Sequence, residues 1–221
     1  MITSASNEKL KLVRKLQSES WRRKLGLFVA EGEDLVAAAR AAGIEPVELL
    51  VAGENVAPEL LAAVSDLPHP PRTVAVFRRA DLPCNTVSLG VALWRVSDPG
   101  NVGTVVRTAG AFGASVGVSV GSADPTSPRA LRASAGAIFR VPVHGFETEG
   151  RRTALVAHGG TPLADVDLSG PLTFVLGAER EGLPDDVVAA CAEVATIPIS
   201  ADVESLNVAA AAAIALYAAA G

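Results

Sequence analysis

Three segments of the sequence place glycines and polar side chains directly after apolar runs that have the composition of buried strands. They span residues 97–103, 177–184 and 197–207. Their candidate reactive side chains are Asn101, Glu179, Ser205 and Asn207, and Arg107 lies one helical turn beyond the first segment. Singly, each segment could be an ordinary turn, a surface carboxylate or a helix cap. Because loops at the carboxyl ends of strands bind ligands in open α/β sheets, the three together predict one polar site.

The elements that must position these loops alternate between strands and helices. In the second part of the chain, strands are expected at 89–96, 115–120, 139–143, 151–158, 161–163, 172–176 and 194–199, and helices at 102–112, 128–138, 184–192 and 206–220. In the first part, helices are expected at 7–24, 35–42 and 58–64, and strands at 25–30, 47–52 and 73–77. Near-continuous apolar strands are typical of a parallel sheet with helices on both faces.

The fold class is therefore α/β, with a change of pattern near the middle of the chain. Residues 79–85 break the periodicity and are the candidate linker. We predict a small α/β domain over residues 1–84 and a larger domain, with a helix-covered parallel sheet, over residues 85–221. Aromatic residues make up only 4% of the chain, so the core must consist of Ala, Val, Leu and Ile.

The net charge of −5 has the wrong sign for a protein that neutralises phosphates, but the charges are sorted along the chain. Residues 1–25 carry seven basic and two acidic side chains, and residues 88–145 carry five and two. The remaining stretches carry seven basic and twenty acidic side chains. The ordinary interpretation of the first run is a solvated helix face, and a nucleic-acid surface is the alternative.

Other classes of protein are disfavoured by simple features. The polar start of the chain does not resemble a signal peptide, and the apolar stretch 208–220 is too short to span a bilayer, so we expect a soluble, cytoplasmic protein. Cys84 and Cys191 stand apart, and the histidines share no ligand spacing with them or with each other. We expect neither a disulfide nor a bound metal.

The order of the three segments resembles the motifs of the SpoU/TrmH family of RNA 2′-O-ribose methyltransferases, within the SPOUT superfamily. The motifs are Asn-x-Gly-x-x-x-Arg ending at Arg107, Leu-Gly-x-Glu-x-x-Gly-Leu starting at Leu176, and Ile-Pro-Ile followed by Val-Glu-Ser-Leu-Asn-Val ending at Val208. The resemblance covers residues 88–221, and the stretch 127–137 belongs to it. Residues 7–76 resemble, less closely, the small substrate-binding domain that many members carry in front.

This resemblance implies S-adenosyl-L-methionine as cofactor, structured RNA (tRNA or rRNA) as substrate, a C-terminal trefoil knot, and a homodimer with the active site near its interface. The implied catalytic residues are Asn101, Arg107, Glu179, Ser205 and Asn207, and the implied cofactor-binding residues are Leu176, Gly177, Ile197, Pro198 and Leu206. With RNA as the partner, the basic residues expected to contact it are Arg14, Lys15, Arg22, Arg23, Arg129 and Arg132.

The implied reaction moves a methyl group from a sulfonium to a ribose oxygen, so the enzyme must align the groups and help the hydroxyl lose its proton. A guanidinium stays protonated, so Arg107 is expected to orient the substrate and stabilise developing charge, or to grip a neighbouring phosphate. Glu179 is the alternative proton acceptor. Gly110, Asp202 and Ala209 stand where Asp, a basic residue and Ser are common in the family, which leaves RNA contacts and the packing of the last helix open.

Two other functions compete. A nicotinamide-dependent Rossmann oxidoreductase would use Gly100 and Gly103 after a strand, with Asp124 about twenty residues later, but Asp98 occupies the position of the first glycine of that fingerprint. A catalytically silent RNA-binding homologue would keep the fold without the reaction, although the catalytic set is intact. The sequence leaves the choice of tRNA or rRNA, and of the modified nucleotide, open.

Overall fold

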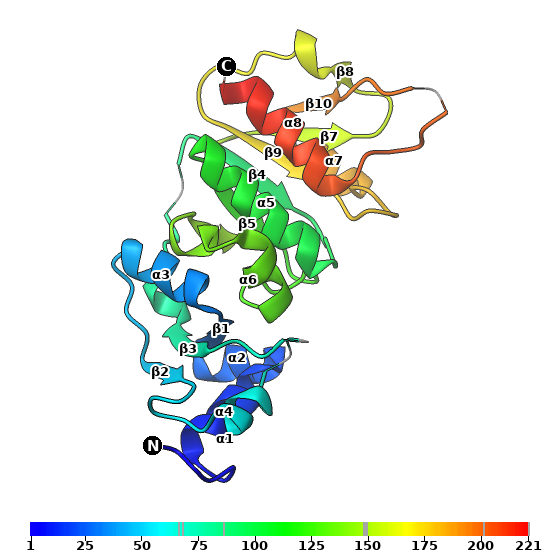
Figure 1. Ribbon diagram of the computed structural model, residues 1–221. Helices are drawn as coiled ribbons and strands as arrows, with labels where there is room; N and C mark the ends of the chain where they lie inside the picture. The colour runs from blue at the N-terminus through cyan, green and yellow to red at the C-terminus, as the bar shows by residue number, and fades with distance from the viewer. Residues whose placement is uncertain (66, 68, 86, 148–149, 201, 221) are drawn as a thin grey trace.

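The computed structural model describes residues 1–221 except 66, 68, 86, 148–149, 201 and 221 (Figure 1). Its N-terminal part has an antiparallel sheet in the order β1 (Leu27–Glu31), β3 (Thr73–Arg78), β2 (Glu48–Val51). The helices of this part are α1 (Glu8–Leu16), α2 (Glu19–Leu25), α3 (Glu33–Ala41) and α4 (Pro58–Ala62). Apolar residues of α1 and α4 pack on one face of the sheet and those of α3 on the other.

The C-terminal part is built on a seven-stranded sheet in which each pair of neighbours is parallel. The strand order is β6 (Val143–Gly145), β5 (Ser115–Val118), β4 (Leu89–Leu93), β9 (Leu172–Leu176), β7 (Arg151–Val156), β10 (Glu193–Thr196), β8 (Thr161–Pro162). Its α-helices are α5 (Pro99–Phe112), α6 (Pro128–Ser134), α7 (Asp185–Ala189) and α8 (Val208–Ala220), and short 3-10 helices are η1 (Arg79–Asp81), η2 (Ala137–Phe139) and η3 (Leu163–Asp165).

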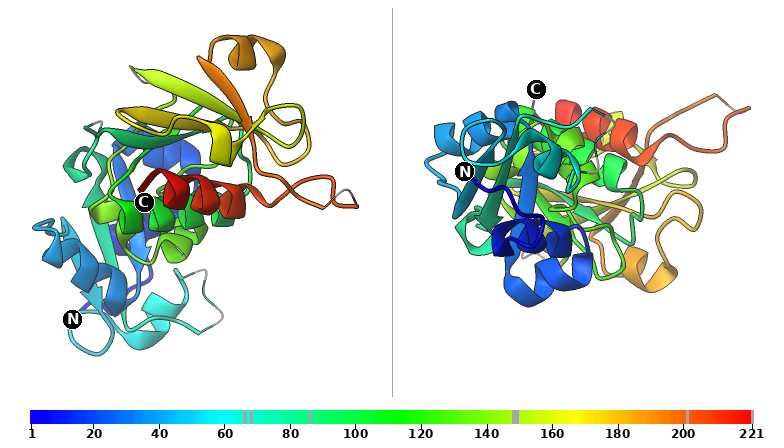
Figure 2. Two further views of the ribbon diagram at one scale, coloured as in Figure 1. Left: turned by 90° about the horizontal axis from the view of Figure 1, so that it is seen from above. Right: turned by 60° about the horizontal axis from the view of Figure 1, so that its bottom comes forward.

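Successive side chains of the central strands point to opposite faces of this sheet, and different helices cover the two faces. Val91 and Leu93 of β4 join the core beneath α5 and α8, whereas Ala92 points the other way and packs with Val175 and with Val187 of α7. Helices α5 and α8 lie side by side (Figure 2). The predicted α/β fold with a helix-covered parallel sheet is confirmed.

The two parts of the chain share a core and a buried ionic cluster. Phe139 of η2 packs against Phe28 and Phe77 of the N-terminal sheet, with ring centroids 6.1 and 5.1 Å apart. Nearby, Asp124 pairs with Arg22 of α2 and with Arg79 of η1, each at 2.7 Å. Arg79, the first residue of the segment predicted as a linker, is thus bound to Asp124 of the C-terminal part.

Two predicted elements are wrong because tertiary contacts outweigh the local pattern. The single helix predicted over 7–24 is two helices, broken where the half-buried Gln17 side chain donates to Glu31 Oε1 at 3.1 Å and to the Val64 carbonyl at 3.2 Å. The strand predicted over 139–143 starts only at Val143. Phe139 instead ends η2 and packs against Phe28 and Phe77 of the N-terminal sheet. Strands β4 and β10 end earlier than predicted, where the chain turns into the site loops.

Candidate active site

A cavity of about 570 Å³ lies at the carboxyl ends of β7, β9 and β10. It is lined by Leu155, Val156, Ala157, Leu176, Gly177, Ala178, Glu179, Arg180, Glu181, Gly182, Leu183, Ile197, Ile199, Glu204, Ser205, Leu206, Val208 and Ala211. Two of the three predicted loops therefore form one pocket, with an apolar floor from the strands and helix α8 and polar groups on its rim. Of the predicted cofactor-binding residues, four line the cavity and Pro198 is the exception.

Tight backbone packing shapes the mouth of this cavity at Gly177. A Cβ built on Gly177 would lie 2.1 Å from the carbonyl carbon of Gly182 and 2.5 Å from the nitrogen of Leu183. Only glycine lets the two ends of the loop after β9 approach so closely. The glycine pattern that the sequence placed here holds the loop closed on itself, which keeps the loop backbone at the edge of the pocket.

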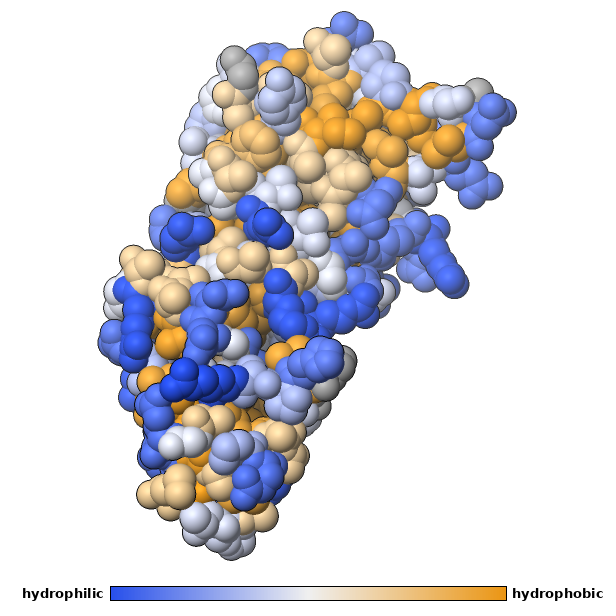
Figure 3. All heavy atoms as spheres, viewed as in Figure 1, coloured by the Kyte–Doolittle hydropathy of each residue, from blue (hydrophilic) through white to orange (hydrophobic). Residues whose placement is uncertain are grey.

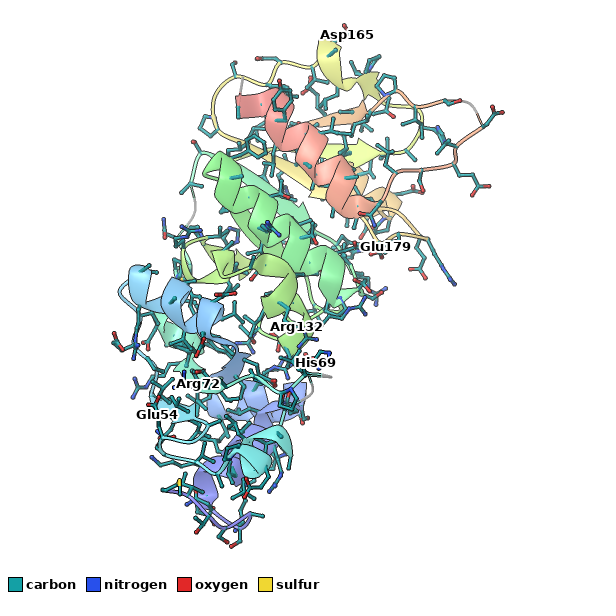
Figure 4. The ribbon with its side chains drawn as sticks, in the orientation of Figure 1. Glu54, His69, Arg72, Arg132, Asp165 and Glu179 are labelled. Carbon is teal, nitrogen blue, oxygen red and sulfur yellow. The ribbon has the colours of Figure 1, made fainter. Side chains whose placement is uncertain are left out.

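A chain of side-chain amides joins the three predicted loops at the rim. Asn101 Nδ2 donates to Glu179 Oε1 at 2.8 Å, and Asn207 Nδ2 donates to Asn101 Oδ1 at 3.1 Å. Asn207 Oδ1 also accepts from the backbone N–H of Ala209 at 2.9 Å and so caps the start of α8. Each amide is fixed from both ends, so the Glu179 carboxylate has a defined position beside the cavity, labelled in Figure 4.

The first loop is held in place by its own cap and by a neighbouring helix. Asp98 Oδ1 accepts from the backbone N–H of Asn101 at 2.9 Å, and Asp98 Oδ2 pairs with Arg129 of α6 at 3.0 Å. At Gly103, a Cβ would lie 2.2 Å from the Ala130 carbonyl oxygen, so α5 and α6 cross in close contact. These contacts fix the start of α5, from which Asn101 reaches the amide chain.

Arg107 stands apart from the amide chain within a single copy of the protein. Its side chain is exposed on α5, and among the described residues it forms no hydrogen bond or ion pair and does not line the cavity. Of the other predicted catalytic residues, Glu179 and Ser205 line the cavity, whereas Asn101 and Asn207 lie at its rim through their bonds to Glu179 and to each other.

The residues predicted to contact RNA occupy different environments. Arg14, Lys15, Arg23 and Arg132 are exposed, and Figure 4 shows Arg132 between Glu179 and the N-terminal part. Arg23 pairs with Glu19 at 2.8 Å, and Arg129 is exposed but pairs with Asp98. The prediction for Arg22 is wrong: its side chain is 3% exposed, pairs with Asp124 and donates to the Leu16 and Gln17 carbonyls, so it is structural.

Asp124 is the best-satisfied carboxylate in the described part of the chain. Besides Arg22 and Arg79, it accepts at Oδ1 from the backbone N–H and the hydroxyl of Thr126, at 2.9 and 2.7 Å. Burial by itself would raise the pKa of Asp124, but the Arg79 charge and the bonds from Thr126 and Arg22 outweigh it and hold that pKa below the ordinary 3.8. The carboxylate stays ionised and joins the two parts of the chain.

The sequence pattern does not predict this anchoring role of Asp124, which enters the sequence-based expectations only as a ribose-binding acid in the oxidoreductase alternative. The local signal is the spacing Asp-x-Thr, which suits a side chain that bonds the backbone two residues on. That signal predicts a turn but does not name the two arginines, which are far away in sequence. Glu181, Arg180 and Glu204 at the cavity were missed for a similar reason, since charged residues in loops are usually solvated.

The fold and the site together define a class of protein. A parallel α/β sheet with a ligand-sized cavity at its carboxyl edge, rimmed by fixed amides and a carboxylate, is the architecture of an enzyme that binds a small polar molecule. Residues 88–217 match the SpoU rRNA methylase family, and residues 7–79 match the MRM3-like substrate binding domain. The chain belongs to the SpoU rRNA methylase family, which removes the nicotinamide oxidoreductase alternative.

Named relatives align over nearly the whole chain. An uncharacterized tRNA/rRNA methyltransferase from Synechocystis is 31% identical, with 98% of this chain and 92% of the relative covered. The 23S rRNA (guanosine(2553)-2′-O)-methyltransferase RlmP of Bacillus subtilis is 30% identical, with 98% and 97% covered. These relatives span both parts of the chain, so the similarity includes the N-terminal part as well as the sheet with the cavity.

Solved structures show the same arrangement. An AdoMet-bound rRNA methyltransferase from Sinorhizobium meliloti superposes with a TM-score of 0.87 at 28% identity, over 99% of this chain and 96% of that one. The SpoU methyltransferase AviRb from Streptomyces viridochromogenes, in complex with AdoMet, also gives a TM-score of 0.87 at 25% identity, over 97% of each chain. The relative placement of the two parts is therefore shared with these proteins.

Proposed function

We propose that this protein methylates a ribose 2′-hydroxyl of structured RNA, a tRNA or an rRNA, with S-adenosyl-L-methionine as methyl donor. The observation that carries the proposal is the amide chain from Asn207 through Asn101 to Glu179 at the rim of the cavity. It brings together the three loops that carry the family motifs. Family membership and the 2′-O-methyltransferase RlmP support the type of reaction, and two AdoMet-bound neighbours support the cofactor.

The cavity fits this cofactor in size and in chemistry. Its volume of about 570 Å³ lies within the range of roughly 300–1,000 Å³ for small-molecule sites. Leu176, Ile197 and Leu206 offer apolar surface, and the loop backbone around Gly177 offers hydrogen-bonding groups. We assign these residues to cofactor binding. When bound, the sulfonium cofactor supplies an electrophilic methyl group.

The residues of the chain would then handle the proton and the developing charge. Glu179 Oε1 accepts from Asn101, and the same carboxylate is a candidate to take the proton that the ribose hydroxyl loses as its oxygen bonds to the methyl carbon. Asn207 and Ser205, which lie just before α8, would keep that side of the cavity rim in position. Arg107, as a permanent cation, would orient the RNA and stabilise negative charge on the ribose oxygen.

A homodimer would explain the position of Arg107. The exposed side of α5 and α8 carries Phe112, stacked edge-on with Tyr217 at 6.4 Å, and Tyr217 and Ile214 are 73% and 40% exposed. Figure 3 shows apolar colours gathered over α8 in the upper part of the molecule. We infer that a second copy covers this side through the catalytic part, which would enclose Arg107 near an active site.

We also infer that the C-terminal segment forms the trefoil knot of the family. The loops that follow β9 and β10 line the same cavity, and the chain leaves β10 only to return with α8 against β4, β9 and α5. The proposed domain division stays at residues 1–84 and 85–221, supported by the two separate sheets. Among the described residues no helix is long and apolar enough to cross a membrane, and an RNA substrate favours a cytoplasmic location.

The experiment that tests the proposal is a comparison of 2′-O-methyl sites in total RNA from cells with and without the gene. One site that disappears with the gene, and that the purified protein restores with S-adenosyl-L-methionine, is the expected result. Calorimetry should show binding of S-adenosyl-L-methionine and none of nicotinamide dinucleotides. Binding of RNA without any lost methylation would instead favour the catalytically silent homologue.

A further inference from the structure

Helix α2 carries a tryptophan between two lysines on the surface of the N-terminal part. The Trp21 ring is half-buried, and the ammonium groups of Lys15 and Lys24 lie over it at 5.1 and 4.8 Å from the ring centroid. Lys15 comes from α1 and Lys24 from the last turn of α2, so two helices meet at this ring. Such distances are those of cation–π contacts.

These two lysines differ from the other basic residues of residues 1–25. Lys9 pairs with Glu48, Lys11 with Glu8, Arg22 with Asp124 and Arg23 with Glu19, and Arg14 donates to the Ala5 carbonyl. Within the described part of the chain, Lys15 and Lys24 have no carboxylate partner. Their charges are therefore available to an anion from outside, and the aromatic ring holds both of them at one place.

The ring and the two cations over it match the chemistry of a single-stranded nucleotide, provided that a stacking base takes the place of the flexible ammonium groups on the ring and these move to its flanking phosphates. An unpaired base stacks on an aromatic side chain, and the flanking phosphates bind ammonium groups, whereas the bases of a duplex are stacked on each other and are not accessible. The segment that holds the three side chains is also rich in cations, since residues 1–25 carry seven basic and two acidic side chains in a chain of net charge −5.

We propose that Trp21, Lys15 and Lys24 form a subsite for one unpaired nucleotide of the RNA substrate, with the base stacked on Trp21 and its phosphates on the lysines. The inference rests on the proposed function, since it assumes an RNA substrate. It adds that this substrate has a loop, bulge or end at a fixed place relative to the methylated ribose.

The buried ionic cluster gives the subsite a fixed position. Arg22 follows Trp21 directly and is held by Asp124, and the chain continues from Asp124 into α6, whose Arg129 pairs with Asp98 at the start of α5. Each of these contacts is at 3.0 Å or less. The stacked base is thereby connected to the start of α5, which carries Asn101, through one buried and one exposed ion pair.

Tryptophan fluorescence tests the subsite directly, because the chain contains only two tryptophans. In a Trp94→Phe background, Trp21 is the only tryptophan, and excitation at the red edge of the absorption band, where Tyr217 does not absorb, isolates its emission. We expect a single-stranded oligoadenylate of about ten nucleotides to quench Trp21 and the same strand annealed to oligouridylate to leave it nearly unchanged. Equal quenching by the two probes would overturn stacking.

Two sets of variants separate stacking from general charge. Trp21→Leu should weaken oligoadenylate binding about tenfold or more, and Trp21→Phe should recover much of the loss. Lys15→Gln with Lys24→Gln should lower the salt slope of log K by about 1.4, because each single-strand phosphate contact contributes about 0.7. The matched pair Lys9→Gln with Lys11→Gln, whose ammonium groups already have carboxylate partners, should change the slope much less. Equal slopes for both pairs, or wild-type affinity of Trp21→Leu, would overturn the subsite.

Methylation assays distinguish failure of the subsite from failure of the proposed function. The Trp21→Leu variant should show a raised KM for substrate RNA, with kcat and S-adenosyl-L-methionine affinity near those of the wild type. If the wild type methylates RNA and Trp21→Leu has an unchanged KM, the subsite is wrong and the function stands. If the wild type methylates no RNA but oligoadenylate still quenches Trp21, the function is wrong and the nucleotide site stands.

Discussion

Asn101 Nδ2 donates to Glu179 Oε1 at 2.8 Å, although the two residues are 78 positions apart in the chain. This bond joins the first turn of α5 to the loop after β9, and Asn207 extends it to the start of α8 at 3.1 Å. The same carboxylate lines the cavity assigned to the cofactor. Among the residues that the structure describes, Glu179 is the carboxylate that both lines this cavity and accepts a hydrogen bond from the motif residue Asn101.

Glu179→Gln should lower kcat for RNA methylation by about 10²-fold or more if the carboxylate takes the ribose proton, because a positioned general base contributes about 10²–10⁴-fold. The affinity for S-adenosyl-L-methionine, measured by calorimetry, should change little. Glu181→Gln is the matched control: Glu181 lines the same cavity but has no bond to Asn101. Similar losses in the two variants would leave Glu179 without a special role.

Arg107→Ala should abolish methylation and leave cofactor affinity largely intact, because the exposed guanidinium lies outside the cavity of its own copy. Arg107→Lys should recover only part of the activity, since a point charge lacks the planar fork that holds a phosphate or an oxyanion from two nitrogens. Single-turnover assays at saturating RNA measure the effect. Near-normal turnover of the alanine variant would remove Arg107 from the reaction centre.

Asp124→Asn should destabilise the protein by about 3 kcal/mol or more, because it leaves the buried guanidinium of Arg22 without its counter-charge. Urea unfolding followed by circular dichroism measures the change. Asp81→Asn removes an exposed pair with Arg78 at 3.8 Å and should cost about 1 kcal/mol or less. Equal losses in the two variants would show that the cluster at Asp124 adds nothing to stability.

The pKa of Asp124 lies below its ordinary 3.8, because the charge of Arg79 and the bonds from Thr126 and Arg22 outweigh burial. The unfolded chain therefore binds a proton before the folded chain does, and the stability from this group is fully present above the ordinary pKa and lost as pH falls through the folded pKa. The stability difference between wild type and Asp124→Asn should be constant at neutral pH and shrink below about pH 4. A difference that grows on acidification would contradict the assigned shift.

Much of the fold and of the candidate site follows from local features of the sequence. The apolar runs of β4 and β9 are long enough and uniform enough to indicate strands buried on both faces, and this property predicts a parallel sheet. The glycines and amides directly after those strands predict where a ligand binds, because strand ends in such sheets converge at one edge. Glu179, expected at this edge of the sheet, lines the cavity, and so does Ser205 from the third predicted loop.

The tertiary structure alone determined which residues are buried and paired when their partners are distant in the chain. Arg22 has the same type and local setting as Arg23, yet Arg22 is buried against a carboxylate 102 positions away and Arg23 is exposed. Nothing local separates the two, because burial of a charge depends on whether a counter-charge meets it in the folded state. The same reason explains why the sequence could name Asn101, Glu179 and Asn207 but only the packing of β4, β9 and α8 could bring them into hydrogen-bonding contact.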